Sequence, residues 1–285
     1  AALHTACREL WAGRDRWENP TPAERDDLLD LAVLLADLEA RVGAGDTGAR
    51  RRALAVLDEA DARFGPRAVL DRDRAVHLRA LGQPEAAAAA DRRAAAAPCR
   101  TAWDHLATGR AALATGDPAG AAAHLDRAVA LDPGSPWANY YAGVARLRTD
   151  DPAGALAAFA ACAAVAPDRA WCVHNRGLAY LELGRVESAL ADFDRALALD
   201  PGLAAARLGR AAALGRAGQL TDALADLDRA AAAGVPAAEV AYRRATLRAA
   251  AGEAAAARAD LRACLSLDPA HRAARGLLEQ LGERP

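Results

Sequence analysis

Residues 171–201 read WCVHNRGLAYLELGRVESALADFDRALALDP and hold two stretches of apolar residues at helical spacing. Gly184 separates the two stretches, and glycine readily adopts the left-handed backbone that ends a helix. Pro201 follows the second stretch and cannot continue it. The segment therefore predicts a helical hairpin, that is, two antiparallel helices joined by a short turn.

The hairpin is one member of a series. Pro201 is preceded by Pro167 and Pro133 at intervals of 34 residues, and the same frame continues forward to Pro269. Five units result when position 1 is placed at Ala102, Pro136, Ala170, Ala204 and Ala238. Position 8 is then small in every unit, as Gly109, Gly143, Gly177, Ala211 and Ala245. Position 24 is large and apolar, as Leu125, Phe159, Phe193, Leu227 and Leu261.

The other fixed positions follow the same logic. Position 15 is a turn residue (Gly116, Asp150, Gly184, Gly218, Gly252), and positions 20 and 27 hold only Ala or Cys. Small residues let helices approach closely, and the large residue at position 24 fills the space between them. One hairpin cannot bury such a face alone, so neighbouring hairpins must stack. The sequence predicts an open superhelix whose first helices line a concave wall.

A 34-residue period with these positions resembles the tetratricopeptide repeat over residues 102–269. The resemblance implies an all-α fold, a right-handed α-α superhelix of helical hairpins, and binding of protein or peptide segments in the concave groove. The aromatic residue that the family usually carries at position 4 is absent, because His105, Asn139, Val173, Arg207 and Ala241 stand there.

The remainder of the chain is expected to flank these repeats. Residues 1–20 predict a short helix and a turn, 21–99 divergent helical hairpins, 100–269 the five repeats, and 270–285 a C-terminal capping helix. A helical N-terminal third before regular repeats is also similar to the C-terminal extension of bacterial receptor-like serine/threonine kinases.

Composition argues against most catalytic classes. All 36 basic residues are Arg, because the chain has no Lys, so neither a Walker phosphate loop, a protein-kinase site nor Schiff-base chemistry can reside here. None of the three serines lies in a G-x-S-x-G motif. We expect no enzyme activity and no cofactor. The net charge of −2, with both signs intermixed, favours neither nucleic acid nor membrane as a partner.

The cysteines and histidines give no sign of a metal site. The five cysteines form no C-x-x-C pair, and Cys162 and Cys264 occupy the small position 27, so we interpret them as packing residues. The six histidines are dispersed, without an H-E-x-x-H motif. No apolar run reaches the ~20 residues of a membrane helix. A cytoplasmic location is expected.

The candidate binding residues lie on the first helices. At 100° per residue, positions 2, 5, 6, 9, 12 and 13 share the face opposite the small residues and should line the groove. The candidates on this face are Trp103, Trp137 and Trp171 at position 2, with Tyr140, Tyr141, His174, Asn175, Arg110 and Arg148 beside them. Two interpretations of the tryptophans stay open: exposed anchors for a peptide, or packing against the preceding hairpin.

The sequence thus predicts a non-catalytic protein-protein interaction scaffold that binds a peptide or protein segment in its groove. The alternative is a regulatory or substrate-docking region of a larger signalling enzyme, such as a serine/threonine kinase, whose catalytic domain lies outside this chain. The identity of the partner and the oligomeric state are not encoded in any pattern that we identify.

Overall fold

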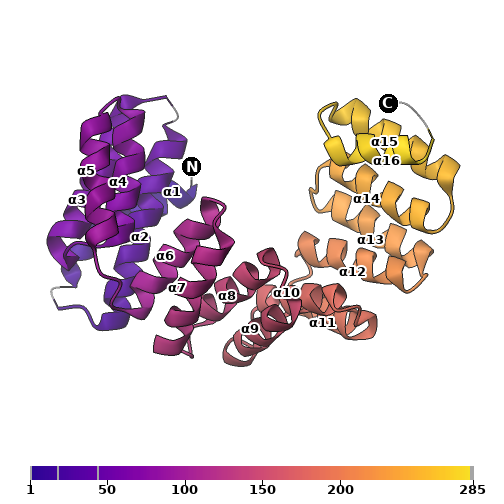
Figure 1. Ribbon diagram of the computed structural model, residues 1–285, viewed down its shortest axis with the longest axis horizontal. Coiled ribbons are helices and arrows are strands. Elements are labelled where there is room, and N and C mark those ends of the chain that lie inside the picture. The colour runs from indigo at the N-terminus through magenta and orange to yellow at the C-terminus, as the bar shows by residue number, and fades with distance from the viewer. Residues whose placement is uncertain (1, 18, 44, 283–285) are drawn as a thin grey trace. The chain divides into compact units, whose positions relative to one another are not determined.

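The computed structural model describes residues 2–17, 19–43 and 45–282, and every regular element among them is a helix (Figure 1). The predicted all-α fold of helical hairpins is confirmed. Residues 1, 18, 44 and 283–285, which fall in the predicted N-terminal, divergent and C-terminal segments, lie outside the described part. The chain divides into two compact units, residues 1–133 and 134–285.

Unit 1 begins with α1 (Ala2–Ala12), a 3₁₀ turn η1 (Arg14–Arg16), α2 (Pro22–Val42) and α3 (Thr47–Phe64). It continues with α4 (Ala68–Ala80), α5 (Pro84–Ala96), α6 (Ala102–Ala114) and α7 (Pro118–Leu131). Consecutive helices pack as the pairs α2/α3, α4/α5 and α6/α7, and α6 also packs on α4. The pair α6/α7 is the first of the regular 34-residue units.

Unit 2 contains the four other 34-residue repeats, each as a pair of helices. The pairs are α8 (Pro136–Arg148) with α9 (Pro152–Val165), α10 (Ala170–Glu182) with α11 (Val186–Leu199), α12 (Ala204–Arg216) with α13 (Leu220–Ala232), and α14 (Ala237–Ala250) with α15 (Ala254–Leu267). A last helix, α16 (Arg272–Gln280), packs on α15 and buries Ala274 and Leu278. Within this unit each hairpin stacks on the next (Figure 1).

Positions 8 and 24 meet inside each hairpin, as the sequence predicts. A Cβ atom added at Gly109 would lie 2.5 Å from the Leu125 side chain, and one added at Gly143 would lie 2.6 Å from the Phe159 ring. Phe159 is completely buried. The first helix can therefore approach the second only because position 8 carries almost no side chain.

The turn at position 15 uses left-handed backbone in every regular unit. The glycines there have φ of +81°, +70°, +74° and +81° at Gly116, Gly184, Gly218 and Gly252, and Asp150 has φ of +60°. Asp is one of the few residues besides Gly that visit this region. Asp150 also stands directly before Asp151, whose side chain accepts a hydrogen bond from the Gly154 N–H and caps α9.

Three hairpins of unit 2 repeat one buried ion pair. Arg176 binds Asp192, Arg210 binds Asp226 and Arg244 binds Asp260, each pair joining the two helices of its hairpin. The carboxylates are buried, whereas the guanidinium groups keep part of their surface in solvent. The pairs recur every 34 residues because the same two positions, 7 and 23, face each other in each hairpin.

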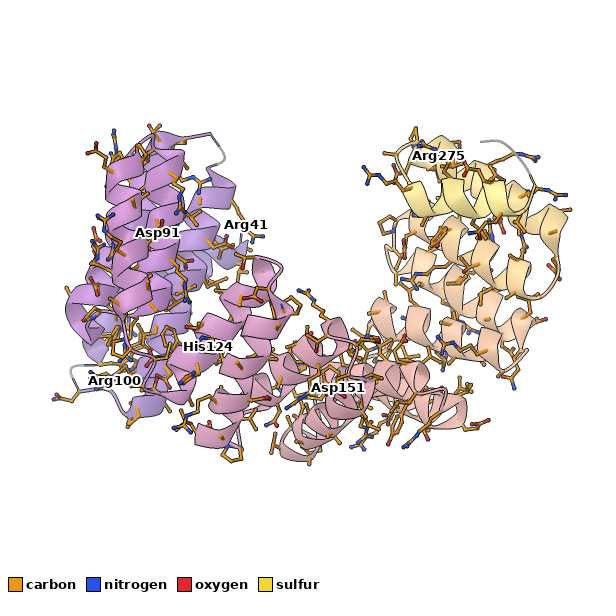
Figure 2. All side chains as sticks on the ribbon, in the orientation of Figure 1. Arg41, Asp91, Arg100, His124, Asp151 and Arg275 are labelled. Atoms are coloured by element: carbon orange, nitrogen blue, oxygen red, sulfur yellow. A yellow bond between two sulfur atoms is a disulfide. The ribbon has the colours of Figure 1, made fainter. Side chains whose placement is uncertain are left out.

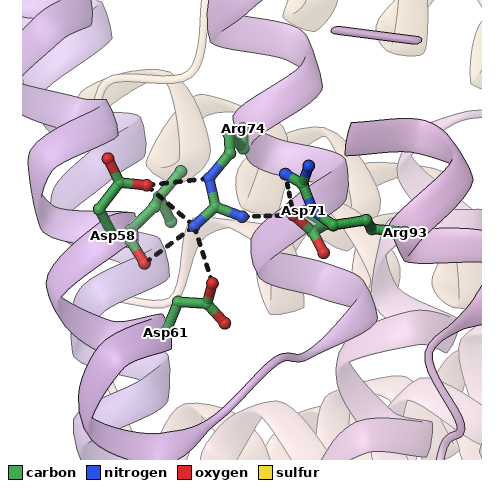
Figure 3. Close-up of polar contacts among 6 residues, drawn as sticks. Asp58, Asp61, Asp71, Arg74 and Arg93 are labelled. Atoms are coloured by element: carbon green, nitrogen blue, oxygen red, sulfur yellow. Dashed lines mark hydrogen bonds and ion pairs between the residues drawn. The ribbon is translucent and has the colours of Figure 1, made fainter. Parts of the chain in front are cut away.

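Unit 1 uses a different and irregular ion-pair network. Arg74 of α4 is buried and binds Asp58 and Asp61 of α3 as well as Asp71 of its own helix (Figure 3). Arg93 of α5 binds the same Asp71 oxygen, Oδ1, at 2.8 Å. The network ties three helices together, and a buried charge of this kind is stable only when it is paired and hydrogen-bonded.

One prediction about the cysteines is wrong. Cys162 at the end of α9 and Cys172 at the start of α10 form a disulfide, with their Cα atoms 5.7 Å apart. Both residues are completely buried. Cys264 occupies the same position 27 as Cys162 but is a free thiol, because Ala274 stands where a second cysteine would be required.

Candidate functional site

Four aromatic side chains gather on α8 and α10 of unit 2, and we call them the aromatic cluster: Trp137, Tyr140, Tyr141 and Trp171. The indole rings of Trp137 and Trp171 are stacked, with centroids 4.5 Å apart and planes within 10° of parallel. Tyr140 stands edge-on to both, 6.1 Å from Trp137 and 4.9 Å from Trp171. Stacked and edge-to-face arrangements are the favourable geometries for aromatic pairs.

The aromatic cluster packs on the hydrophobic core. Tyr140 lies 6.0 Å from the buried ring of Phe159, and Trp171 packs on the core that contains Cys162 and Cys172. Burial raises the pKa of the Tyr140 hydroxyl above its usual value. Trp137, in contrast, keeps 50% of its surface exposed. The cluster therefore presents one rigidly held indole to solvent.

The other predicted residues of this region have different roles. The Asn175 amide donates a hydrogen bond to the Trp171 carbonyl oxygen at 2.7 Å, so it is used within α10. His174 is buried against Phe193, and burial lowers its pKa to about 4. The prediction that His174 lines the groove is therefore wrong. Arg148 is exposed at the end of α8. Its positive charge lowers the pKa of the Tyr140 hydroxyl, against the larger effect of burial.

Two predicted residues belong to unit 1 and are not part of the aromatic cluster. Trp103 is only 4% exposed and lies in the same buried cluster as Trp11, Leu29 and Leu70. Trp103 is therefore a core residue and not an exposed anchor, and its core includes residues of α1 and α2 beyond the preceding hairpin. Arg110 makes an ion pair with Asp30 of α2 at 3.1 Å. Tryptophans at the same position of successive hairpins thus have opposite environments.

The structure also brings together one cysteine and two histidines, residue types for which the sequence predicted no metal site. Cys99, His105 and His124 each place one potential ligand atom within 4.8 Å of the others. His105 and His124 face each other across the α6/α7 hairpin, with 3.2 Å between their Nδ1 atoms. Their signal in the sequence is a departure from the repeat, because the later units carry no His at positions 4 or 23.

Among the described residues, no helix combines the length and the apolar character that a membrane span requires.

Sequence patterns of the tetratricopeptide repeat family match residues 112–177, 170–203 and 238–271. The chain is a tetratricopeptide repeat (TPR) protein. Its regular hairpins correspond to the repeats of that family. No curated protein matches this TPR protein over its sequence.

Solved structures of TPR proteins share its fold. A TPR protein from Parabacteroides merdae is 16% identical, with a TM-score of 0.63 over 91% of this chain and 99% of that one. A thermophilic TPR protein from Thermus thermophilus is 22% identical, with a TM-score of 0.56 over 64% and 98%. The Cut9-Hcn1 hetero-tetramer of the APC/C contains a chain that is 13% identical, with a TM-score of 0.60 over 91% and 53%.

TPR proteins bind protein or peptide partners, and they are typically scaffolds without catalytic activity. The fold therefore supports a protein-protein interaction scaffold, and no catalytic activity is indicated.

Proposed function

We propose that this TPR protein is a non-catalytic scaffold that holds a peptide or protein segment in a concave groove lined by the first helices of unit 2. The aromatic cluster on α8 and α10 is the anchor of this site. The single observation that carries the proposal is the half-exposed Trp137, stacked on Trp171 above a buried core.

The geometry suits an anchor for physical reasons. Tryptophan buries a large area with few rotatable bonds, so it loses little entropy on binding, and it is enriched among the residues that dominate interface energetics. Trp137 is already fixed by Trp171 and Tyr140, which lowers the entropy cost of ordering it further. We propose a partner segment that covers the exposed indole with an aromatic or branched aliphatic side chain.

The burial of each tryptophan decides which substitution can test the site. A triple substitution of Trp103, Trp137 and Trp171 would remove core residues, because Trp103 is buried and Trp171 packs on the core. Trp137→Ala removes only the half-exposed indole. Leu199→Ala is a matched control, since Leu199 is 40% exposed on α11 of the same unit and lies outside the aromatic cluster.

The experiment has two steps. The immobilised chain first captures partners from a native lysate, and binding of the identified segment is then measured by calorimetry with the parent, Trp137→Ala and Leu199→Ala proteins. We expect Trp137→Ala to weaken binding by about 2 kcal/mol, or roughly 30-fold, with Leu199→Ala unchanged. A correctly folded Trp137→Ala protein that binds as tightly as the parent would place the partner elsewhere.

A further inference from the structure

The cluster of Cys99, His105 and His124 lies entirely in unit 1, at the first regular hairpin. Cys99 precedes α6, His105 is in the first turn of α6, and His124 is in the middle of α7, where Figure 2 labels it. All three side chains are partly buried and partly accessible. Nothing in the proposed scaffold function uses them.

The backbone around Cys99 is held in place by its neighbours. The Asp104 carboxylate accepts hydrogen bonds from the backbone N–H groups of Arg100 and Thr101, at 3.0 and 2.9 Å, and binds the Arg67 guanidinium. These contacts fix the segment that carries Cys99 against the start of α6. The Cys99 sulfur lies 3.5 Å from the hydroxyl oxygen of Thr108, which is buried on α6.

The packing of the repeats does not require these side chains. The residues equivalent to His105 in the four later units are Asn139, Val173, Arg207 and Ala241, and those equivalent to His124 are Ala158, Asp192, Asp226 and Asp260. In three of those hairpins an Arg–Asp ion pair joins positions 7 and 23. The first hairpin has Thr108 and His124 at these positions, so a potential metal ligand replaces the buried carboxylate.

We propose that Cys99, His105 and His124 bind a divalent metal ion of the zinc class, with a water molecule as the fourth ligand. Two nitrogen ligands of a tetrahedral zinc ion lie about 3.3 Å apart, given Zn–N bonds of about 2.0–2.1 Å. The Nδ1 atoms of His105 and His124 are 3.2 Å apart, which is this spacing. Thiolate and imidazole ligands select zinc over magnesium or calcium, which prefer oxygen.

The surroundings leave room for the fourth ligand but also carry positive charge. A pocket of about 290 Å³, lined in part by Thr108, Asp117 and His124, adjoins the cluster. The positive charges of Arg127 and Arg72 act on the two imidazoles and weaken attraction for a dication, so the single thiolate must offset them.

The alternative to a metal is a direct hydrogen bond between the two rings, with one Nδ1–H donating to the other Nδ1. The two arrangements differ in whether Cys99 takes part. A metal ion is bound by all three residues, with the Cys99 sulfur as a thiolate ligand. With a hydrogen bond between the rings, Cys99 is an ordinary thiol near Thr108.

The test uses the full chain without a histidine tag, with its free thiols reduced, titrated with Co²⁺ and then with Zn²⁺. A tetrahedral Co²⁺ site gives intense visible d–d bands, and a cysteine ligand adds a thiolate-to-cobalt charge-transfer band in the near ultraviolet. We expect both signals to saturate at one ion per chain and to disappear as Zn²⁺ displaces Co²⁺. Zinc should also raise the melting temperature, because it binds the folded state.

The chain itself supplies fold-compatible variants. Asn and Ala stand at the equivalent positions of the next hairpin, so His105→Asn and His124→Ala replace the ligands with residues that this fold accepts, and Cys99→Ala removes the sulfur. Each should weaken zinc binding at least tenfold, while Cys264→Ala, which removes a thiol on α15, should leave it unchanged. Absence of Co²⁺ bands in the parent, bands without thiolate charge transfer, or equal affinity in the three ligand variants would each overturn the proposal.

Discussion

Gly143 and Phe159 are in direct contact across the α8/α9 hairpin, and the space between them would not hold one more carbon atom. A Cβ atom at residue 143 would meet three atoms of the Phe159 ring between 2.6 and 2.8 Å. Two hairpins of unit 2 solve the same contact differently, with Ala211 opposite Leu227 and Ala245 opposite Leu261. In those two hairpins position 8 carries a methyl group opposite a Leu, whereas Gly143 lies opposite a Phe ring.

The first prediction follows from this contact. Gly143→Ala should lower the free energy of unfolding of unit 2 by about 1–3 kcal/mol, because overpacking forces a buried ring to move. Phe159→Leu in the same chain should restore part of the loss, so the double variant is more stable than the sum of the single effects. Urea denaturation monitored by circular dichroism measures all three.

Gly276→Ala is the matched control for that prediction. Gly276 lies inside α16 with no atom within 4 Å of an added Cβ. Alanine there should stabilise the helix by up to about 1 kcal/mol, since glycine is a poor helix former. If Gly143→Ala behaved like Gly276→Ala, the close contact with Phe159 would be refuted.

The ion pair between Arg210 and Asp226 should respond unequally to loss of either partner. Asp226 is 1% exposed and also contacts Arg229, whereas Arg210 retains access to solvent and to Asp194. Arg210→Ala leaves a buried carboxylate short of charge compensation and should cost about 3 kcal/mol. Asp226→Ala should cost less, about 2 kcal/mol, because Arg210 can pair with Asp194.

Chemical denaturation of both variants tests this order of effects. Glu239→Ala serves as the control, because Glu239 and Arg243 form a partly exposed pair on one turn of α14, and neither residue is buried. Such pairs contribute only about 0.3–0.5 kcal/mol. Equal losses for Arg210→Ala and Asp226→Ala would contradict the burial argument.

The disulfide between Cys162 and Cys172 should make the stability of unit 2 depend on redox conditions. The bridge closes a loop of 10 residues. Loop-closure entropy then predicts that reduction lowers the free energy of unfolding by about 2–3 kcal/mol. Denaturation with and without reductant measures the difference. A Cys162→Ala, Cys172→Ala double variant should be insensitive to reductant, whereas Cys264→Ala should respond like the parent.

His174 should make unit 2 less stable in acid. Burial lowers its pKa from 6.5 to about 4, so the unfolded chain binds a proton at a higher pH than the folded chain does. The contribution of this pKa difference to the free energy of unfolding is complete above pH 6.5. It is lost progressively as the pH falls toward about 4, by up to about 3 kcal/mol. Below that pH both states are protonated and the loss stops growing.

Comparison with His174→Leu isolates this effect from the titration of carboxylates. Leucine stands at the equivalent position 5 in two other units, as Leu106 and Leu208, so the fold accepts it. The difference in stability between variant and parent should grow from pH 7 to pH 4.5. A difference that stays constant across this range would show that His174 is not held neutral by burial.

The sequence alone was sufficient for features that recur inside each hairpin. Position 8 faces position 24, and position 15 forms the turn, because those relations depend only on helical period and on residues 16 or fewer apart. Because the relation recurs in five repeats, the pattern can be recognised in the sequence. The pattern predicts both the hairpin fold and the family.

Tertiary structure decided what happens between hairpins and at the irregular N-terminal part. Helical period gives the direction of a side chain relative to its own hairpin, but its burial depends on which residues lie opposite. Trp103 is buried because the irregular helices of unit 1 contribute Trp11 and Leu29 to the same core, whereas Trp137 stays half exposed. Cys162 meets Cys172, and Cys99 lies near His105 and His124, only because separate segments fold against one another.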